Sequence, residues 1–489
     1  MELFLYLRIL ILINLGMRNN SLILLCCVLA FAKTAACQDD HYWSQQFGAV
    51  STSMGGAVVG GVRDNSAIFY NPGAQAFIDN PSLSVDADLY KIDRLMIRNG
   101  AGENVNLNST EYSIYPQIVA GLINLVTVPR FNFGYCILTR NHTNVLMNTR
   151  FTNRDLENNP DPNAEFISAF DYSNQMDEQW LGLSASYKIN EKHGIGVTLF
   201  GSYKWQTYSM TKFIREIRYV DTTVWFNTFN IDEYVDYSMV HLLAKFGWAF
   251  ETGRWRVGIS ATSPAIRFYG RGTIQREVSF YSASDRPGDT ATSFLILDRK
   301  KSVKTYSRYP FALSAGAEYH TSRTRVALTA EFFTGTAAYN MMSTESDPLV
   351  YPPWIKDSAD VQQYLTGYLN LETQSRPVLN VALGFSQELS KKFALMLGAR
   401  TDFSSFKKSE NTDILIHDSG EWDLYNVSAG VSYHNQKQTV TLGFSYTFSP
   451  KKSIDPYAIL NPLSPESLHS TVFSQTFGLI LGYTHYIKY

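Results

Sequence analysis

The sequence predicts an all-β fold: a transmembrane antiparallel β-barrel of about 14 strands, preceded by a small N-terminal hatch or plug. From Ser82 onward, stretches appear in which every second residue is apolar. Between Thr439 and Phe448, for example, Val440 and Leu442 share one face, and small polar residues share the other. The links between these stretches are alternately short and long, which is typical of outer-membrane barrels with brief periplasmic turns and long external loops.

Taken in order, the expected strands lie near residues 82–93, 108–124, 129–139, 178–189, 194–208, 238–250, 255–270, 302–320, 325–339, 377–389, 393–403, 422–433, 438–448 and 474–488. The brief links are 126–129, 190–193, 251–254, 321–324, 390–392 and 434–437, and the long loops include 140–177, 209–237, 271–301 and 340–376. A soluble sandwich would bury its apolar face against a second sheet. The strict alternation of link lengths favours the barrel, whose apolar face meets lipid.

Composition and the N-terminus indicate an exported protein. The formal net charge of −2 gives no electrostatic reason to expect a nucleic-acid partner. Residues 1–37 are expected to be a signal peptide, with Arg18 ahead of an apolar run and small residues before Cys37, and Met17 is a plausible true start. Beyond this segment, no run approaches the roughly 18 apolar residues of a spanning helix. We expect a multi-pass barrel in the bacterial outer membrane.

No residue pattern points to catalysis or to a cofactor. Of the 4 cysteines, Cys26, Cys27 and Cys37 lie in or beside the signal, so Cys136 stands alone and neither a disulfide nor a cysteine metal site is expected. The histidines lack metal-ligand spacing, and no Ser/His constellation is recognisable, although some outer-membrane barrels hydrolyse lipids with such a pair. We therefore expect no enzyme and no metal or other cofactor.

The last expected strand ends on Tyr489, with Ile487, Tyr483 and Leu481 on the same face. An alternating terminal strand that ends on an aromatic residue looks like the signal by which the bacterial barrel-assembly machinery recognises its clients. That machinery and outer-membrane lipid are the partners this end of the chain predicts.

Residues 38–80 break the strand rhythm and divide the chain into a signal (1–37), a hatch (38–80) and a barrel (81–489). Gly55 and Gly56 permit positive φ and close backbone approach. Asp64 and Asn65 favour turns and helix caps, and Pro72 pushes the preceding Asn71 toward an extended conformation. Short helices and tight turns of this kind suit a plug packed in a barrel mouth.

The hatch sequence resembles that of the outer-membrane long-chain fatty acid transporter family, which includes toluene and other aromatic-hydrocarbon channels. The matching residues are Met54-Gly-Gly-Ala57, Asp64-Asn-Ser-Ala-Ile-Phe-Tyr70 and Asn71-Pro72. The family's usual Asn-Pro-Ala-Gly order is replaced here by Asn71-Pro72-Gly73-Ala74, and Gly73 is expected to loosen that turn. The resemblance assigns the hatch and gate to Gly55, Gly56, Asp64, Asn65, Asn71, Pro72 and Gly73.

The resemblance also implies a function. The expected channel takes up hydrophobic small molecules, long-chain fatty acids or aromatic hydrocarbons, by passive, hatch-gated diffusion. Ligands would be captured at the external loops and leave through a lateral opening in the wall. Such an opening needs a kinked strand, which we expect around Pro129 or Gly134 in the third strand.

Alternation turns several charged side chains into the lumen, where Lys204, Lys245 and Arg400 are candidates for binding a ligand carboxylate. Cross-lumen ion pairs are the structural alternative for these residues. Because the inward face shows no evidently greasy lining, a polar-solute porin remains open. A structural or adhesive barrel that binds partners through its long loops remains open as well.

Overall fold

The computed structural model describes residues 41–125, 127–152, 164–220, 223–282, 293–357, 362, 365–407, 420–460, 464 and 467–487. The expected signal peptide and the terminal Tyr489 lie outside these described residues. None of the described helices is long and apolar enough to cross a membrane.

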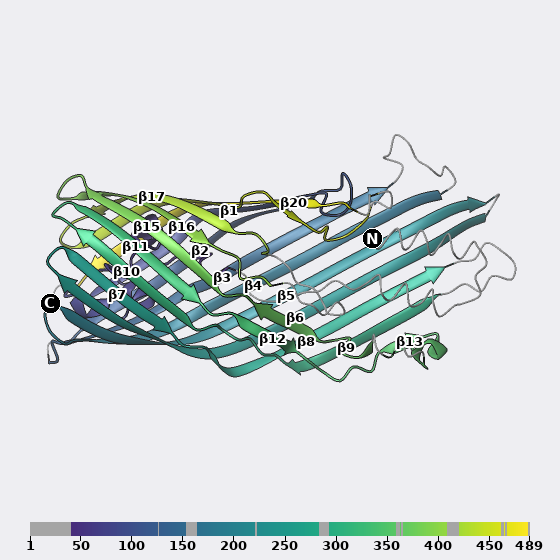
Figure 1. Cartoon of the computed structure of the whole chain (residues 1–489), viewed down its shortest axis with the longest axis horizontal. Helices are drawn as coiled ribbons and strands as arrows, with labels where there is room; N and C mark the ends of the chain where they lie inside the picture. Colours follow the sequence, from purple (N-terminus) through teal and green to yellow (C-terminus); the bar gives the residue numbers. More distant parts are fainter. Residues whose placement is uncertain are drawn as a thin grey trace.

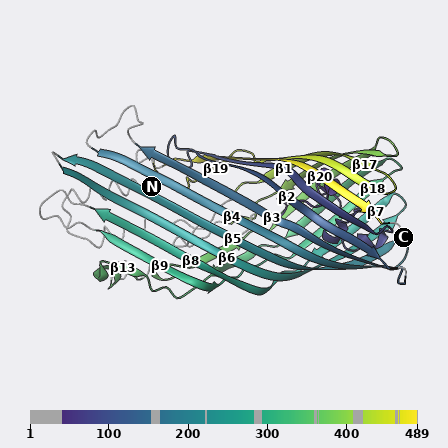
Figure 2. The ribbon, with the colours of Figure 1, turned by 180° about the vertical axis from the view of Figure 1, so that it is seen from behind.

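The wall is a closed antiparallel barrel of 14 strands, as predicted. Each strand pairs with its neighbour in the chain, and the last strand, β20 (Ser470–Tyr486), pairs with both β18 (Gln438–Phe448) and β1 (Ser82–Arg98). Figure 2 shows this closure, with β20 beside β1. Closure pairs the first strand with the last, so neither becomes an open edge in lipid, where each unpaired backbone group is costly by several kcal/mol.

The other strands of the ring are β2 (Leu107–Asn124), β3 (Phe131–Thr152), β4 (Ala164–Lys188), β5 (His193–Val220), β6 (Thr223–Thr252), β7 (Trp255–Thr262), β10 (Ala312–His320), β11 (Thr324–Phe333), β15 (Val378–Glu388), β16 (Phe393–Asp402) and β17 (Leu424–His434). Further strands extend the wall or its loops: β8 (Ile266–Ser282), β9 (Phe294–Lys304), β12 (Thr336–Met342), β13 (Leu349–Tyr351), β14 (Leu371–Ser375) and β19 (Lys452–Ile454). The loop after β13 contains the short helix η3 (Pro353–Asp357).

The expectation of long loops at 140–177, 209–237 and 271–301 was wrong, because most of the described part of these segments is strand. β5 has 28 residues and β6 has 30, whereas a tilted membrane strand needs only about 9–11. The two strands stay paired from His193 to Val220, so the wall projects far beyond the membrane (Figure 1, right). Outside the membrane the outward side chains no longer need to be apolar, and the alternation that revealed the strands therefore fades.

Toward the short-turn end, the outer surface carries a belt of exposed apolar side chains. Leu383, Leu397, Val431 and Leu442 on four adjacent strands are between 44% and 55% exposed. A belt of this kind is the lipid-facing surface of an outer-membrane barrel. Fold and belt together place the protein in the outer membrane.

The N-terminal segment, residues 41–80, lies inside the barrel and is called the hatch below. Its helix α3 (Ala49–Ser53) contacts β16, β17, β18 and β20, and its 3-10 helix η1 (Ala74–Phe77) contacts β3, β4, β5 and β6. Between them lies α4 (Ala67–Tyr70), which contacts β3 and β4. Only a segment within the lumen reaches strands on opposite sides of the wall (Figure 1, dark purple).

The lumen above the hatch is filled by apolar side chains, contrary to the expectation of an interior that is not greasy. Phe170, Tyr208 and Phe229 of the long strands are at most 3% exposed, and they belong to a cluster that loop residues such as Leu369 and Leu460 complete. The charged residues that the sequence turns into the lumen, such as Lys204 and Lys245, lie below this apolar cluster and beside the hatch. The sequence pattern predicts loops at 140–177, 209–237 and 271–301, so it does not reveal the inward apolar face of the strands that form there.

The ladder is interrupted at two places in the wall. β2 and β3 pair only up to Ile118 and Leu138, beyond which the two strands separate. The second interruption splits the seventh strand into β7 and β8 and the eighth into β9 and β10. The expected kink at Gly134 is not found, because Gly134 pairs regularly with Leu122 and Ser184.

Candidate functional site

Asn71 fastens the hatch to the wall. Its side chain is fully buried, and its Nδ2 donates to the carbonyls of Val59 in the hatch (2.9 Å) and Trp248 in β6 (3.1 Å). Its Oδ1 accepts a hydrogen bond of 3.0 Å from the backbone N–H of Gly73. The extended backbone at Asn71, with φ −154° and ψ 96°, is the conformation that a following proline favours. One amide therefore holds the turn, the hatch and β6 together.

Gly73 allows the hatch turn to approach the wall closely. A Cβ at this position would lie 2.7 Å from the carbonyl oxygen of Gly247 in β6. Gly196 and Gly258 on neighbouring strands face the same turn at similarly short range. The missing Cβ of Gly73 therefore permits tight docking there, and the expectation that Gly73 loosens the turn stays a prediction.

Three further predicted hatch residues also contact the wall or the hatch itself. Asn65 donates from Nδ2 to the carbonyl of Ala120 (3.0 Å) and accepts from the Ser82 hydroxyl (2.7 Å). Gly55, at φ +67°, would carry a Cβ only 2.9 Å from the backbone nitrogen of Ala399. Gly56, at φ +81°, packs against a neighbouring hatch side chain.

Asp64 shapes a turn in the hatch and does not contact a wall strand through a described hydrogen bond. Its carboxylate accepts a 2.9 Å hydrogen bond from the backbone N–H of Ser66 and a second one from the Ser66 hydroxyl. Burial raises the pKa of the Asp64 carboxyl, and the two hydrogen bonds oppose that shift. The residue therefore serves the internal structure of the hatch.

The hatch separates two cavities. The lower cavity, about 710 Å³, is lined by hatch residues such as Asp64 and by short-turn residues such as His434 and Asn435. The upper cavity, about 80 Å³, is lined on its floor by Trp43 and Tyr70 of the hatch. Because it lies between the hatch and the apolar upper lumen, it is the candidate ligand site, and it is called the aromatic cavity below.

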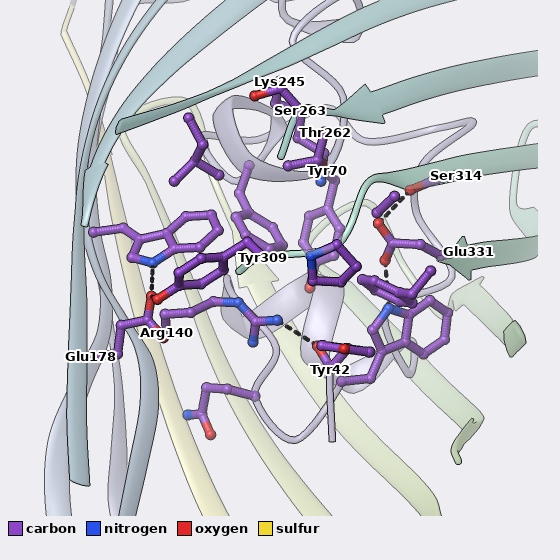
Figure 3. A pocket seen from close by; sticks show the side chains of 18 of the residues that line it. Tyr42, Tyr70, Arg140, Glu178, Lys245, Thr262, Ser263, Tyr309, Ser314 and Glu331 are labelled. Atoms are coloured by element: carbon purple, nitrogen blue, oxygen red, sulfur yellow. Dashed lines mark hydrogen bonds between the residues drawn. The ribbon is translucent and has the colours of Figure 1, made fainter. Parts of the chain in front are cut away.

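Aromatic rings from the hatch and the wall line this cavity. The rings of Tyr42 and Phe333 stack with their centres 4.4 Å apart. The centre of the Trp180 ring lies 6.2 Å from that of Phe69 and 6.4 Å from that of Tyr309. Figure 3 shows Tyr309 in the middle of the site, with its hydroxyl directed to Glu178. The lining gives a ligand a set of apolar ring faces.

The two carboxylates in the cavity are satisfied by neutral donors. Glu178 accepts hydrogen bonds from Tyr309 (2.6 Å), Trp180 (2.5 Å) and Ser202 (2.8 Å). Glu331 accepts from the Trp43 indole (2.5 Å) and from the hydroxyl of Ser314 (2.7 Å). All three donors reach Oε1 of Glu178, whereas Glu331 accepts one of these hydrogen bonds at each carboxylate oxygen.

Lys204 and Lys245, two of the predicted lumenal cations, both line the aromatic cavity. They are 3% and 5% exposed, and neither ammonium has a carboxylate oxygen within 4.0 Å among the described residues. The Lys245 ammonium lies 4.5 Å from the centre of the Phe69 ring, an attractive but modest contact. Two buried cations therefore line the same cavity as Glu178 and Glu331 without forming a direct ion pair with either carboxylate.

Arg400, the third predicted cation, lies elsewhere. It borders a separate cavity of about 190 Å³ against β1, β2, β3 and β16, together with Asp402 and His142. Its guanidinium donates to the Asn426 side chain over 3.2 Å. The structure therefore brings Lys204 and Lys245 together and leaves Arg400 in this second site, the charged cavity.

Sequence reasoning missed Tyr309 and Glu178, which form the centre of the aromatic cavity. One signal was present in the sequence: Pro264 and Pro310 fall inside the expected strands 255–270 and 302–320. A proline in a central strand indicates an interrupted ladder. That signal marks the part of the wall where Tyr309 turns inward.

Several solved outer-membrane channels share the architecture. The Ralstonia pickettii toluene transporter TbuX has a TM-score of 0.53 at 12% identity, covering 91% of this chain and 99% of that one. A Pseudomonas aeruginosa FadL homologue has 0.52 at 13% identity, covering 93% and 99%. The Pseudomonas putida toluene transporter TodX has 0.56 at 12% identity, covering 91% and 99%.

The chain has the fold of these channels. They are the kind of protein that the hatch motif resembles, so the predicted fold is confirmed from an independent direction. No family model matches the sequence, and no curated protein matches it either. At 11–13% identity the likeness concerns the fold, and the ligand has to be argued from the cavity itself.

Proposed function

We propose that this barrel takes up hydrophobic small molecules across the outer membrane by passive diffusion, with the hatch as the gate. The observation that carries this proposal is the aromatic cavity, which lies directly on the hatch and beneath an apolar upper lumen. A hydrophilic pore would instead need a continuous polar lining. The polar outer leaflet is a barrier to apolar molecules. An apolar cavity inside the barrel gives them a binding site on a route that avoids this leaflet.

The cavity also indicates a ligand with a negatively charged end. Lys204 and Lys245 are buried without a direct ion pair to a described carboxylate, and a buried charge of this kind gains stability when a partner binds in contact with it. A carboxylate would supply that partner while its apolar part contacts Trp180 and Phe69. We therefore favour amphipathic carboxylates, aromatic or fatty acids, over neutral hydrocarbons.

Size restricts the ligand further. About 80 Å³ admits several water molecules, since one needs roughly 10–15 Å³. A compact ring or the head of an acyl chain fits this space, and a long chain would require the apolar side chains of the upper lumen to move aside. The neighbouring structures include a toluene transporter and a monoaromatic hydrocarbon channel, which supports a hydrophobic ligand here.

Uptake and binding measured together test this function. Radiolabelled oleate, 4-phenylbutyrate and toluene are offered to a transporter-deleted host with and without this chain, and quenching of tryptophan fluorescence reports binding to the purified barrel. We expect faster uptake of both carboxylates than of toluene, and saturable quenching by the carboxylates. A surface-exposed, folded barrel that neither binds nor transports any of the three would refute the proposal.

The charged cavity favours a second candidate, the passage of polar solutes. It holds Lys91, Asp93, His142 and Arg400, a lining suited to water and small ions. Swelling of liposomes that contain the barrel, measured with sugars and amino acids, separates the two candidates. Rapid swelling with the hatch in place would favour the porin function over hydrophobic uptake.

A further inference from the structure

Four cationic side chains lie close together on the outer surface of the wall, where β8 and β9 begin to pair above the membrane. Arg271 of β8 pairs directly with Lys304 of β9, and Arg299 and Lys301 lie further up β9. All four side chains are exposed. β8 and β9 run side by side along the wall (Figure 1). These four residues are called the basic patch below.

A β-bulge in β9 turns the patch outward. Along a regular strand, Lys301 and Val303 would share one face, and Lys304 would lie on the other. The pairing with β8 shifts register between residues 272 and 274, and Ser302, at φ +56°, occupies the bulge. Beyond the shift, Val303 is buried in the upper lumen and Lys304 is exposed. The bulge therefore places Lys301 and Lys304 together on the outside.

The cations of the patch have no acidic partner on the wall. Within the part of the chain that the structure describes, none of the four has a carboxylate oxygen within 4.0 Å. Arg271 and Lys304 are directly opposed cross-strand neighbours, which is unfavourable for like charges. On its other side Arg271 pairs with Ser238 of β6, and Arg299 pairs with Gln275 of β8. The strands therefore hold these charges together without neutralising them.

The patch lies directly above the lipid-facing part of the wall. Ile266 and Phe268 of β8 are 72% and 78% exposed, and Tyr269 and Tyr306 follow at 45% and 43%. Exposed tyrosines gather where the hydrocarbon region meets the headgroups, so these two rings mark the upper interface. The cross-strand pair of the patch lies two residues beyond them along each strand. For a tilted strand this is about 5 Å further from the hydrocarbon, at the level of lipid headgroups.

The adjoining strands are not basic at this level. Trp205 of β5 and Ser238 of β6 continue the ladder row of Arg271. Asp236 of β6 and Glu277 of β8, two outward carboxylates higher in the wall, each accept a hydrogen bond from a hydroxyl group, at 3.0 and 3.3 Å. Among β5, β6, β8 and β9, the outward positive charge at this level is therefore confined to β8 and β9.

We propose that the basic patch binds the phosphate groups of an outer-leaflet lipid, the phosphorylated sugar headgroup of lipopolysaccharide. Arginine and lysine form strong charge-assisted hydrogen bonds with phosphate, and basic clusters at a membrane surface bind anionic headgroups. The acyl chains of the same lipid would contact Ile266 and Phe268. A soluble anionic partner would first have to displace the lipid around the wall at this level. The inference concerns the outer surface and does not depend on the uptake function.

Lipid binding to the purified full-length barrel tests the proposal. Native mass spectrometry from a neutral detergent measures the bound fraction of lipid A, the membrane anchor of lipopolysaccharide, with its two phosphates and after their removal. Two folded variants each remove two charges from the patch: Arg271→Gln with Lys304→Gln, and Arg299→Gln with Lys301→Gln. The matched control, Lys391→Gln with Lys392→Gln, removes the same charge from two exposed lysines at a short turn. Heat-dependent migration in gel electrophoresis checks folding, and either patch variant suffices for the comparison.

We expect the parent and the control to bind phosphorylated lipid A at least fivefold more than the dephosphorylated form, and the patch variants to lose this preference. Added salt should weaken the binding, because exposed charges are screened. Equal binding of both lipids by the parent, or the same loss in the control as in a patch variant, overturns the proposal. Complete displacement of the lipid by millimolar inorganic phosphate also overturns it, since the patch would then be a site for free phosphate.

Discussion

Replacing Asn71 with alanine is expected to release the hatch from the wall and to open the barrel to ions and large solutes. The change leaves the carbonyls of Val59 and Trp248 and the N–H of Gly73 without their partner in a buried site. Each orphaned buried group costs about 1–3 kcal/mol. A loss of about 3 kcal/mol in hatch docking raises the open population roughly a hundredfold.

Planar bilayer conductance measures this effect directly. The parent is expected to be nearly silent, and Asn71→Ala to show frequent openings, together with sensitivity of the host to large hydrophilic antibiotics. Asn190→Ala is the matched control, because that asparagine also accepts backbone hydrogen bonds but lies in an exposed short turn. Equal conductance of parent and Asn71→Ala would show that the hatch is held by other contacts.

The barrel was predictable because lipid imposes one requirement on every strand within it. Outward residues must be apolar there, so alternation identified the lower part of each strand and the number of strands in the ring. Above the membrane that requirement ends. The paired extensions of β5 and β6 therefore carry a mixed outward face, with polar residues such as Asp232 and apolar ones such as Phe226, and such a face does not predict strands.

The candidate site was predictable only in part. Alternation correctly turned Lys204 and Lys245 inward, but it gave no information on which inward residues share a cavity, so Arg400 was grouped with them. Cavity membership depends on the height and stagger of strands around the ring and on where the hatch sits. Tyr309 was missed for a related reason. Residues 306–311 have no ladder pairs, so the strict alternation of inward and outward side chains does not apply to them.

Replacing Lys245 with methionine is expected to separate binding of carboxylates from binding of neutral ligands. Methionine keeps the length and apolar volume of the side chain and removes the charge. A hydrogen bond to a charged group contributes about 1.5–3 kcal/mol, so affinity for 4-phenylbutyrate should fall roughly 10- to 100-fold. Affinity for toluene should change little. Quenching titrations of purified parent and variant with both ligands measure the difference.

The stability of the same variant distinguishes a ligand-binding lysine from a structural one. Lys245 is 5% exposed and has no carboxylate within 4.0 Å among the described residues, so its removal relieves a buried charge that lacks a direct ion pair. The thermal midpoint of Lys245→Met should therefore equal or exceed that of the parent, and Lys188→Met, at an exposed ion pair with Glu191, serves as the control. A lower midpoint with equal loss of both ligands would mean that Lys245 supports the packing of the wall. A selective loss of carboxylate binding in an equally stable barrel would show that an unpaired cation is retained because the ligand neutralises it.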